Sequence, residues 1–297
     1  MAIGATPVPH AIDGPRNDLL PWAVLGLGLL AVVVPTYVRL HETLWKQEAY
    51  EHGFIVAVLF WWLIWRERSS LQPGRSAPWP AAGVPLFAAG LFLYFVGRSQ
   101  NLPLFEVSAH LPIFAGLLLT THGWATLRSL WFPLLFLVFM IPLPGFVTLA
   151  ITGELKQQVS WMAESLLYAA GYPIARDGVV ITIGQYRMLV ADACAGLNSI
   201  YSLTAMGLLY MYLMQRPRWS HNLILLASIL PVAIAANLLR VLVLILLTFH
   251  FGDEAGQGFM HGASGIFLFV VALLLLIALD LLLVRTVFRR RPAREAS

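Results

Sequence analysis

Three residue types that suit acyl-transfer chemistry follow one another in the second half of the chain: Cys194, Arg240 and His261. A cysteine thiolate can attack a peptide carbonyl and form a thioester. Histidine can accept the thiol proton and later donate a proton to the leaving amine. Arginine stays protonated, so its contribution is electrostatic: it favours the thiolate and stabilises the developing oxyanion. Together the three can perform thiol-based acyl transfer, provided that the fold brings them together.

Each of the three residues also has a non-catalytic interpretation. Cys194 is the only cysteine, so it is not half of an internal disulfide; it is either a small inert hydrophobic residue or a nucleophile. Arg240 lies inside an apolar stretch, where it can be a functional residue, extend to the outer interface or pair with a carboxylate such as Glu106. His261 can be an interfacial or helix-capping residue. The catalytic interpretation therefore depends on whether the three residues share one depth of a membrane.

The composition is that of a polytopic membrane protein. The chain is 59% hydrophobic and 11% charged, and this charged fraction is less than half of the roughly 25% typical of soluble domains. The first residues lack the basic region and early apolar core of a signal peptide, so we expect the first helix to act as the insertion signal. We attribute the formal net charge of +4 to membrane topology rather than to nucleic-acid binding.

A spanning helix needs about 20 mostly apolar residues. The sequence predicts eight such helices, at 19–38, 53–65, 79–97, 102–121, 127–147, 195–214, 222–249 and 262–284. The second is short, and the seventh contains Pro231, where we expect a kink or a break. The predicted fold class is therefore an all-α polytopic membrane protein with about eight transmembrane helices.

The distribution of Lys and Arg predicts the orientation of these helices. With both termini in the cytoplasm, cytoplasmic segments carry 12 of the 19 Lys and Arg, outer segments carry 6, and Arg240 lies within a span. Residues 1–297 then form a single integral-membrane domain, with an external loop at 148–194 and a basic cytoplasmic tail at 285–297.

This orientation places the three reactive residues at the outer face. Arg240 lies roughly 28 Å along the seventh helix, near its outer end. Cys194 and His261 precede helices that run from the outside inwards. All three are therefore expected at one depth of the membrane, in an active site that faces the outer compartment.

Two elements are predicted within the external loop. Its first half has a helical period, with one apolar face formed by Leu155, Val159, Met162 and Leu166. We expect this amphipathic helix to lie at the membrane surface. Two short strand-like runs around Gly184-Gln185 predict a β-hairpin before the sixth span.

The motifs around the three reactive residues resemble those of the exosortase/archaeosortase family. The segments concerned are Val190-Ala191-Asp192-Ala193-Cys194-Ala195-Gly196-Leu197-Asn198, Asn237-Leu238-Leu239-Arg240, and His261-Gly262 followed by Gly265. Their order and spacing match the family, as does Ile141-Pro142-Leu143-Pro144 ahead of them. The N-terminal part resembles the exosortase B subtype, on the residues Val34-Pro35-Thr36-Tyr37, Trp45 and Glu51-His52-Gly53.

The resemblance implies a cysteine protease or transpeptidase of the Gram-negative inner membrane. Such enzymes process exported proteins that carry a C-terminal Pro-Glu-Pro motif, a transmembrane helix and a basic tail, and they accompany extracellular polysaccharide loci. The roles carried over are nucleophile for Cys194, transition-state stabiliser for Arg240 and acid/base for His261. The implied partners are these clients and membrane lipid, without nucleic acid, metal or cofactor.

Several polar residues are candidates for supporting roles. Asn198 and Asn237 can orient Cys194 and Arg240, or can instead bond a neighbouring helix. The remaining candidates for substrate binding also have structural alternatives: Glu106 with His110 can make an interhelical contact, His52 can be an interfacial residue, and Asp192 can pair with Arg187.

Two other classes of protein compete with the enzyme. A transporter would have a similar number of spans and a proline-interrupted helix, but usually shows related halves and a midplane site. A non-catalytic assembly factor for polysaccharide export would need no thiol. Cys194→Ser separates these classes, because only thiol chemistry should collapse. A metal enzyme is disfavoured, because the eight histidines show no ligand spacing such as H-E-x-x-H.

Overall fold

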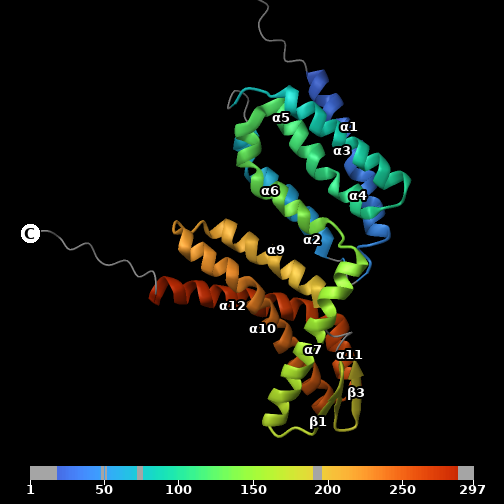
Figure 1. Cartoon of the computed structure of the whole chain (residues 1–297), viewed down its shortest axis with the longest axis vertical. Helices are drawn as coiled ribbons and strands as arrows, with labels where there is room; N and C mark the ends of the chain where they lie inside the picture. Colours follow the sequence, from blue (N-terminus) through green and yellow to red (C-terminus); the bar gives the residue numbers. More distant parts are fainter. Residues whose placement is uncertain (1–18, 48–49, 51, 72–75, 190–195, 287–297) are drawn as a thin grey trace, which may run out of the picture. The chain divides into compact units, whose positions relative to one another are not determined.

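The computed structural model describes residues 19–47, 50, 52–71, 76–189 and 196–286. The chain divides into two units, Met1–Leu44 and Trp45–Ser297. The first contributes helix α1 (Leu19–Glu42) to the described part (Figure 1). The second contributes all the other described elements: α2 (His52–Arg66), η1 (Arg68–Leu71), α3 (Pro80–Ser99), α4 (Pro103–Ser108), α5 (His110–Ser129), α6 (Trp131–Phe136), η2 (Leu137–Met140), α7 (Gly145–Ala169), β1 (Ile174–Asp177), β2 (Val180–Ile183), β3 (Tyr186–Leu189), α9 (Gly196–Met214), α10 (Trp219–Phe251), α11 (Asp253–Gly262) and α12 (Ser264–Thr286).

The helices confirm a multi-pass membrane protein. Among the described residues, five are long and apolar enough to cross a membrane: Trp22–Glu42, Pro80–Ser99, Pro103–Ser129, Trp219–Phe251 and Ser264–Thr286. Three shorter apolar helices coincide with the other predicted spans: His52–Arg66, Trp131–Met140 and Ile200–Met214. The number of eight spans therefore stays a prediction.

Prolines shorten the fifth apolar stretch. The sequence predicts a helix over 127–147, but helical structure after Trp131 ends at Met140. Ile141 has an extended backbone (φ −73°, ψ 120°), because a residue that precedes a proline is disfavoured in the α conformation. The next helix, α7, begins only after Pro144.

Helix α10 is continuous through Pro231, so the structure shows no break there, and the alternative, a kink, stays a prediction. A proline removes one main-chain hydrogen bond, and long transmembrane helices tolerate this loss when neighbouring helices support them. With 33 residues, α10 is about 50 Å long, which exceeds the roughly 30 Å of a hydrocarbon core. Helix α10 is therefore longer than a membrane crossing needs.

The segment predicted as an external loop contains a three-stranded antiparallel sheet in the order β1-β2-β3. The predicted hairpin is confirmed: Ile183 pairs with Tyr186 across the two-residue loop Gly184-Gln185. Gly184 has a φ of 55°, and type II′ hairpin turns favour glycine at this first loop position. Strand β1 was not predicted, because its sequence Ile-Ala-Arg-Asp has no clear strand alternation.

Helix α7 confirms the predicted helix and most of its apolar face, since Leu155, Val159 and Met162 pack in one core and only Leu166 does not. Val159, Ala163 and Leu167 are buried and share a core with strand residues and with Val241 and Ile245 of α10. Leu166, which the apolar period assigns to the inner face, is 51% exposed. Protein rather than lipid covers the buried side of α7, because the sheet and α10 provide a ready apolar surface (Figure 1).

Helices α3 and α5 pack side by side through glycines. Gly83, Gly90 and Gly97 recur every seven residues on α3 and are buried. A Cβ atom on Gly97 would lie 2.8 Å from the Cα of Glu106, so only glycine permits this approach to α4. Such small-residue stripes are typical of helix contacts in membranes.

Candidate active site

Arg240 is buried and directed at the start of α12. It is 7% exposed, and its Nη2 donates a hydrogen bond to Ser264 Oγ at 3.0 Å. Ser264, itself buried, is the first residue of α12 and follows His261 by three positions. The guanidinium is thus held inside the protein instead of extending to the interface. The carboxylate of Glu106 is engaged elsewhere, by Arg98.

Helix α11 returns the chain from the C-terminal end of α10 toward Arg240. Gly256 packs against Thr248, since a Cβ atom on Gly256 would overlap the Thr248 hydroxyl. Thr248 lies eight residues after Arg240, and Ser264 lies eight residues after Gly256. Segment 240–248 of α10 and segment 256–264 are thus antiparallel, and the same register of residue pairing fits the contact at each end.

His261 lies within this register. It belongs to the last turn of α11 (Asp253–Gly262), where its backbone is described but its side chain is not. The expectation that it opens the eighth span is corrected, since α12 begins at Ser264. Because Ser264 contacts Arg240, the backbone of His261 lies within about one helical turn of the Arg240 level.

Cys194 lies outside the described residues, as does Asp192. Helix α9, which follows, begins at Gly196, and its residue Ile200 packs with Ala236 and Leu268 in one apolar cluster. Ile200 follows Gly196 by four positions, Ala236 precedes Arg240 by four, and Leu268 follows Ser264 by four. Four positions are about one helical turn. The start of α9 therefore reaches the level of the Arg240–Ser264 hydrogen bond.

The supporting candidates separate into two groups. Asn237 is buried one turn before Arg240 and so shares its surroundings; the side chain of Asn198, in the first turn of α9, is outside the described residues. Glu106 instead accepts a hydrogen bond from Arg98 Nη1 at 2.9 Å. His110 places Nδ1 3.1 Å from the carbonyl oxygen of Glu106. Glu106 thus makes a polar contact between α3 and α4, and its role in substrate binding stays a prediction.

His52 contacts the first turns of α9. Its ring lies 5.8 Å from that of Tyr201 in an edge-to-face arrangement, and Tyr201 Oη donates to Val138 O at 2.5 Å. His52 also lines an apolar cavity of about 250 Å³ with residues of α2, α9 and α12, among them Met206 and Phe269. It is therefore placed beside the helix that carries the cysteine motif.

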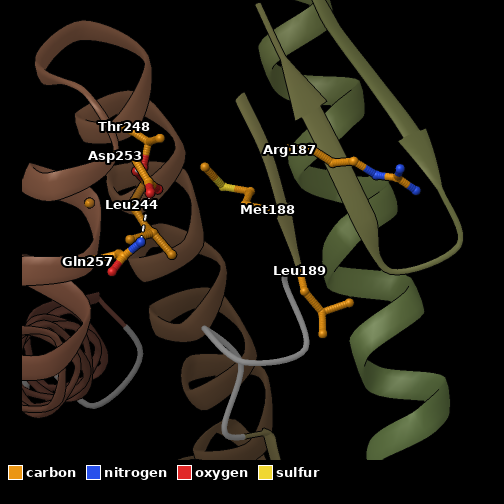
Figure 2. Close-up of a pocket in the computed structure, with 8 residues that line it drawn as sticks. Arg187, Met188, Leu189, Leu244, Thr248, Asp253 and Gln257 are labelled. Carbon is orange, nitrogen blue, oxygen red and sulfur yellow. Dashed lines mark hydrogen bonds between the residues drawn. The ribbon is translucent and has the colours of Figure 1, made fainter. Parts of the chain in front are cut away.

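A second cavity, of about 230 Å³, opens between β3, α10 and α11 (Figure 2). It is lined by Arg187, Met188, Leu189, Leu244, Thr248, Asp253, Gly256 and Gln257. Figure 2 shows Met188 directed toward α10 and α11, whereas the guanidinium of Arg187 points away from them. Gln257 Nε2 donates to Asp253 Oδ2 at 2.7 Å on the α11 wall.

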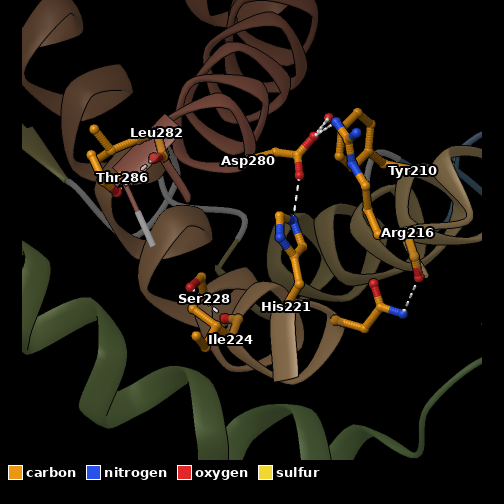
Figure 3. Close-up of polar contacts among 9 residues, drawn as sticks. Tyr210, Arg216, His221, Ile224, Ser228, Asp280, Leu282 and Thr286 are labelled. Atoms are coloured by element: carbon orange, nitrogen blue, oxygen red, sulfur yellow. Dashed lines mark hydrogen bonds and ion pairs between the residues drawn. The ribbon is translucent and has the colours of Figure 1, made fainter. Parts of the chain in front are cut away.

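A buried carboxylate joins α9, α10 and α12 at the end of these helices that lies away from Arg240 and Ser264 (Figure 3). Asp280 of α12 is fully buried and accepts hydrogen bonds from Tyr210 Oη (2.8 Å), Arg216 Nη2 (2.5 Å) and His221 Nε2 (2.6 Å). The hydrogen bond to Asp280 raises the pKa of the Arg216 guanidinium above its ordinary value. Asp280 lies 16 residues, or about 24 Å, from Ser264 along α12, so this cluster anchors the helices without touching the candidate site.

Sequence reasoning missed Ser264, Thr248 and helix α11. Ser264 directly follows the His261-Gly262-Ala263 segment, so its position was a usable signal. Helix α11 has acidic residues in its first turn, a common helix-start signal, but its glycines obscure the pattern. In the described part of the chain, no three His, Cys, Asp or Glu side chains gather in an arrangement that could hold a metal ion.

The fold and site define a multi-pass helical membrane protein with a buried arginine at the junction of three helices and a small three-stranded sheet. A protein-family model described as transmembrane exosortase (Exosortase_EpsH) matches residues 44–278. The chain therefore belongs to the transmembrane exosortase family, whose general activity is that of a membrane cysteine transpeptidase. No curated protein and no solved structure matches the chain.

Proposed function

We propose that the chain is a membrane-embedded cysteine protease or transpeptidase that uses Cys194 as its nucleophile. One observation carries this proposal: buried Arg240 bonds Ser264, three residues after His261, at the level where α9 begins. Covalent geometry limits the Cα separation of Cys194 and Gly196 to about 7 Å. This limit supports Cys194 as the nucleophile that acts with Arg240 and His261.

The proposed reaction proceeds through a thioester. The sulfur of Cys194 bonds to the scissile carbonyl carbon, and the displaced electron pair moves to the oxygen, which Arg240 stabilises. Collapse of this intermediate breaks the C–N bond, while His261 passes to the leaving nitrogen the proton it took from the thiol. Water or an amine then attacks the thioester and releases the thiol. Arg240 has five N–H donors, one of which bonds Ser264 Oγ.

The proposed clients are exported proteins with a C-terminal Pro-Glu-Pro motif, a transmembrane helix and a basic tail. Support comes from the family and from the excess of Lys and Arg in the predicted cytoplasmic segments, which favours a site at the periplasmic face of the inner membrane. A client helix in the same membrane would present its motif at the depth of Arg240. The residues around Trp45 and His52 support the exosortase B subtype.

The test is the processing of a co-expressed client. Cys194→Ala should leave the client with its C-terminal helix attached, and mass spectrometry of the mature C-terminus from wild-type cells should give the cut site and any attached group. His261→Ala should block cleavage or accumulate the enzyme–client thioester. Processing at the wild-type rate in Cys194→Ala would refute the enzyme, leaving a transporter or an assembly factor for polysaccharide export.

A further inference from the structure

Strand β3 is an edge strand that borders the cavity of Figure 2. In the sheet order β1-β2-β3, it pairs with β2 on one side only, and α7 packs against the β1 and β2 side. The other side of β3 adjoins the cavity, whose opposite wall is formed by Leu244 and Thr248 of α10 and by α11. An edge strand presents a row of main-chain donors and acceptors that an extended chain can pair with.

The hairpin register identifies which main-chain groups face this edge. With a two-residue loop, the flanking pair Ile183–Tyr186 exchanges both hydrogen bonds, and bonded and non-bonded pairs then alternate. Tyr186 and Met188 therefore use their N–H and C=O groups toward β2. Arg187 and Leu189 direct theirs to the opposite edge.

Residues that line the cavity are close in sequence to all three candidate catalytic residues. Leu189 precedes Cys194 by five residues, Leu244 follows Arg240 by four, and Gln257 precedes His261 by four. At the α10 and α11 walls, a ligand in the cavity thus lies about one helical turn from the level of Arg240.

The lining suits part of an extended polypeptide. Its volume of about 230 Å³ is below the roughly 300–1,000 Å³ of pockets that enclose a drug-sized ligand. The walls combine apolar Met188 and Leu244 with the hydroxyl of Thr248 and the hydrogen-bonded pair Asp253–Gln257. One or two side chains can enter while the main chain stays at the β3 edge.

We propose that this cavity and the edge of β3 form the binding site for an extended segment of the client, which pairs with Arg187 and Leu189 and places a side chain between Met188 and α11. This inference rests on the proposed function, because it assigns the cavity to the substrate of the same site. It predicts that client recognition depends on main-chain pairing next to the scissile bond, with side-chain selection in the cavity.

The first test blocks the cavity in the full-length enzyme, reconstituted in lipid vesicles with a synthetic peptide that carries the Pro-Glu-Pro motif and its helix. Gln257→Trp should raise KM about tenfold, which corresponds to roughly 1.4 kcal/mol of binding free energy. Glu254→Trp is the matched control, because Glu254 is exposed on the same helix and does not line the cavity. Alkylation of Cys194 by a small reagent should proceed equally in both variants. Equal KM values in the two variants, or slower alkylation in Gln257→Trp, would overturn the inference.

The second test addresses main-chain pairing. Arg187→Pro removes an N–H at the open edge, where β2 does not need it, whereas Arg187→Ala keeps that N–H. The proline variant should show a KM about tenfold above that of the alanine variant, the size expected for one or two lost hydrogen bonds. Equal KM values would exclude pairing at this edge.

Cross-linking separates this inference from the proposed function. In a Cys194→Ala background, a photoreactive amino acid in place of Leu189 should capture the peptide, whereas the same group in place of the exposed Leu166 on α7 should not. Peptide captured equally at both positions, or at neither, would overturn the site. If the wild-type enzyme leaves the peptide intact, the proposed function fails, and cross-linking at Leu189 still decides whether the cavity binds it.

Discussion

Replacing Asp280 with asparagine tests whether the buried carboxylate holds α9, α10 and α12 together. Asp280 is fully buried and accepts three hydrogen bonds, two of them from Arg216 and His221 (Figure 3). Removing one partner of a buried ion pair typically costs about 3–5 kcal/mol, because the remaining charge stays desolvated. The Arg216 side chain is 31% exposed, so water can replace part of the lost interaction. We therefore expect Asp280→Asn to lower the free energy of unfolding by about 3 kcal/mol.

Denaturant-induced unfolding of the purified protein in detergent measures this change. Glu164→Gln is a matched control, since it removes the carboxylate of a partly exposed ion pair with Arg176 at 3.0 Å. Exposed pairs contribute roughly 0.2–1 kcal/mol, so the control should unfold nearly as the wild type does. Tyr210→Phe should fall between the two, because it removes one hydrogen bond, typically worth about 1 kcal/mol. If Asp280→Asn is no less stable than Glu164→Gln, the cluster does not anchor the three helices.

Two further predictions concern the site and its orientation. Arg240→Lys should lower client cleavage about a hundredfold, because lysine keeps the charge but loses the planar fork that can bond Ser264 and an oxyanion together. Ser264→Ala, assayed alongside, should lower client cleavage about tenfold, since Arg240 remains but loses a hydrogen bond that holds it. Near-normal cleavage by the lysine variant would reduce Arg240 to a counter-charge. Reporter fusions should place Gln157 outside the membrane and Arg216 inside, as the distribution of Lys and Arg predicts, and finding both on one side would contradict the shared depth of Cys194 and Arg240.

Hydropathy located the apolar helices but not all their ends. Each predicted apolar stretch overlaps a helix, because a run of apolar residues is a local property of the sequence. The fifth ends early at Met140, where two nearby prolines override hydrophobicity. At Pro231 the opposite holds, since the surrounding helix continues. A proline alone does not tell which outcome applies, because the neighbouring helices decide it.

Packing partners were beyond the reach of sequence reasoning. The buried face of α7 was predicted from its period, yet Leu166 is exposed, because the sheet and α10 cover a stripe through Ala163 instead. Glu106 was an open candidate for substrate binding. Its ion pair with Arg98 depends on the close approach that Gly97 allows, which only the folded structure shows.

The arrangement of α10 explains why a motif scattered along the sequence can form one site. Arg240 faces α12, while the next residue, Val241, is buried against α7 and the sheet. Adjacent residues of one helix thus belong to the helical bundle and to the core shared by α7 and the sheet. The segment that carries Cys194 connects the same two parts, since β3 of the sheet precedes it and α9 of the bundle follows it. Helix α10 is shared by both parts and therefore sets where that segment starts and ends. Loosening the core around Val241 and Ile245 should thus impair cleavage, even though neither residue can react with a client.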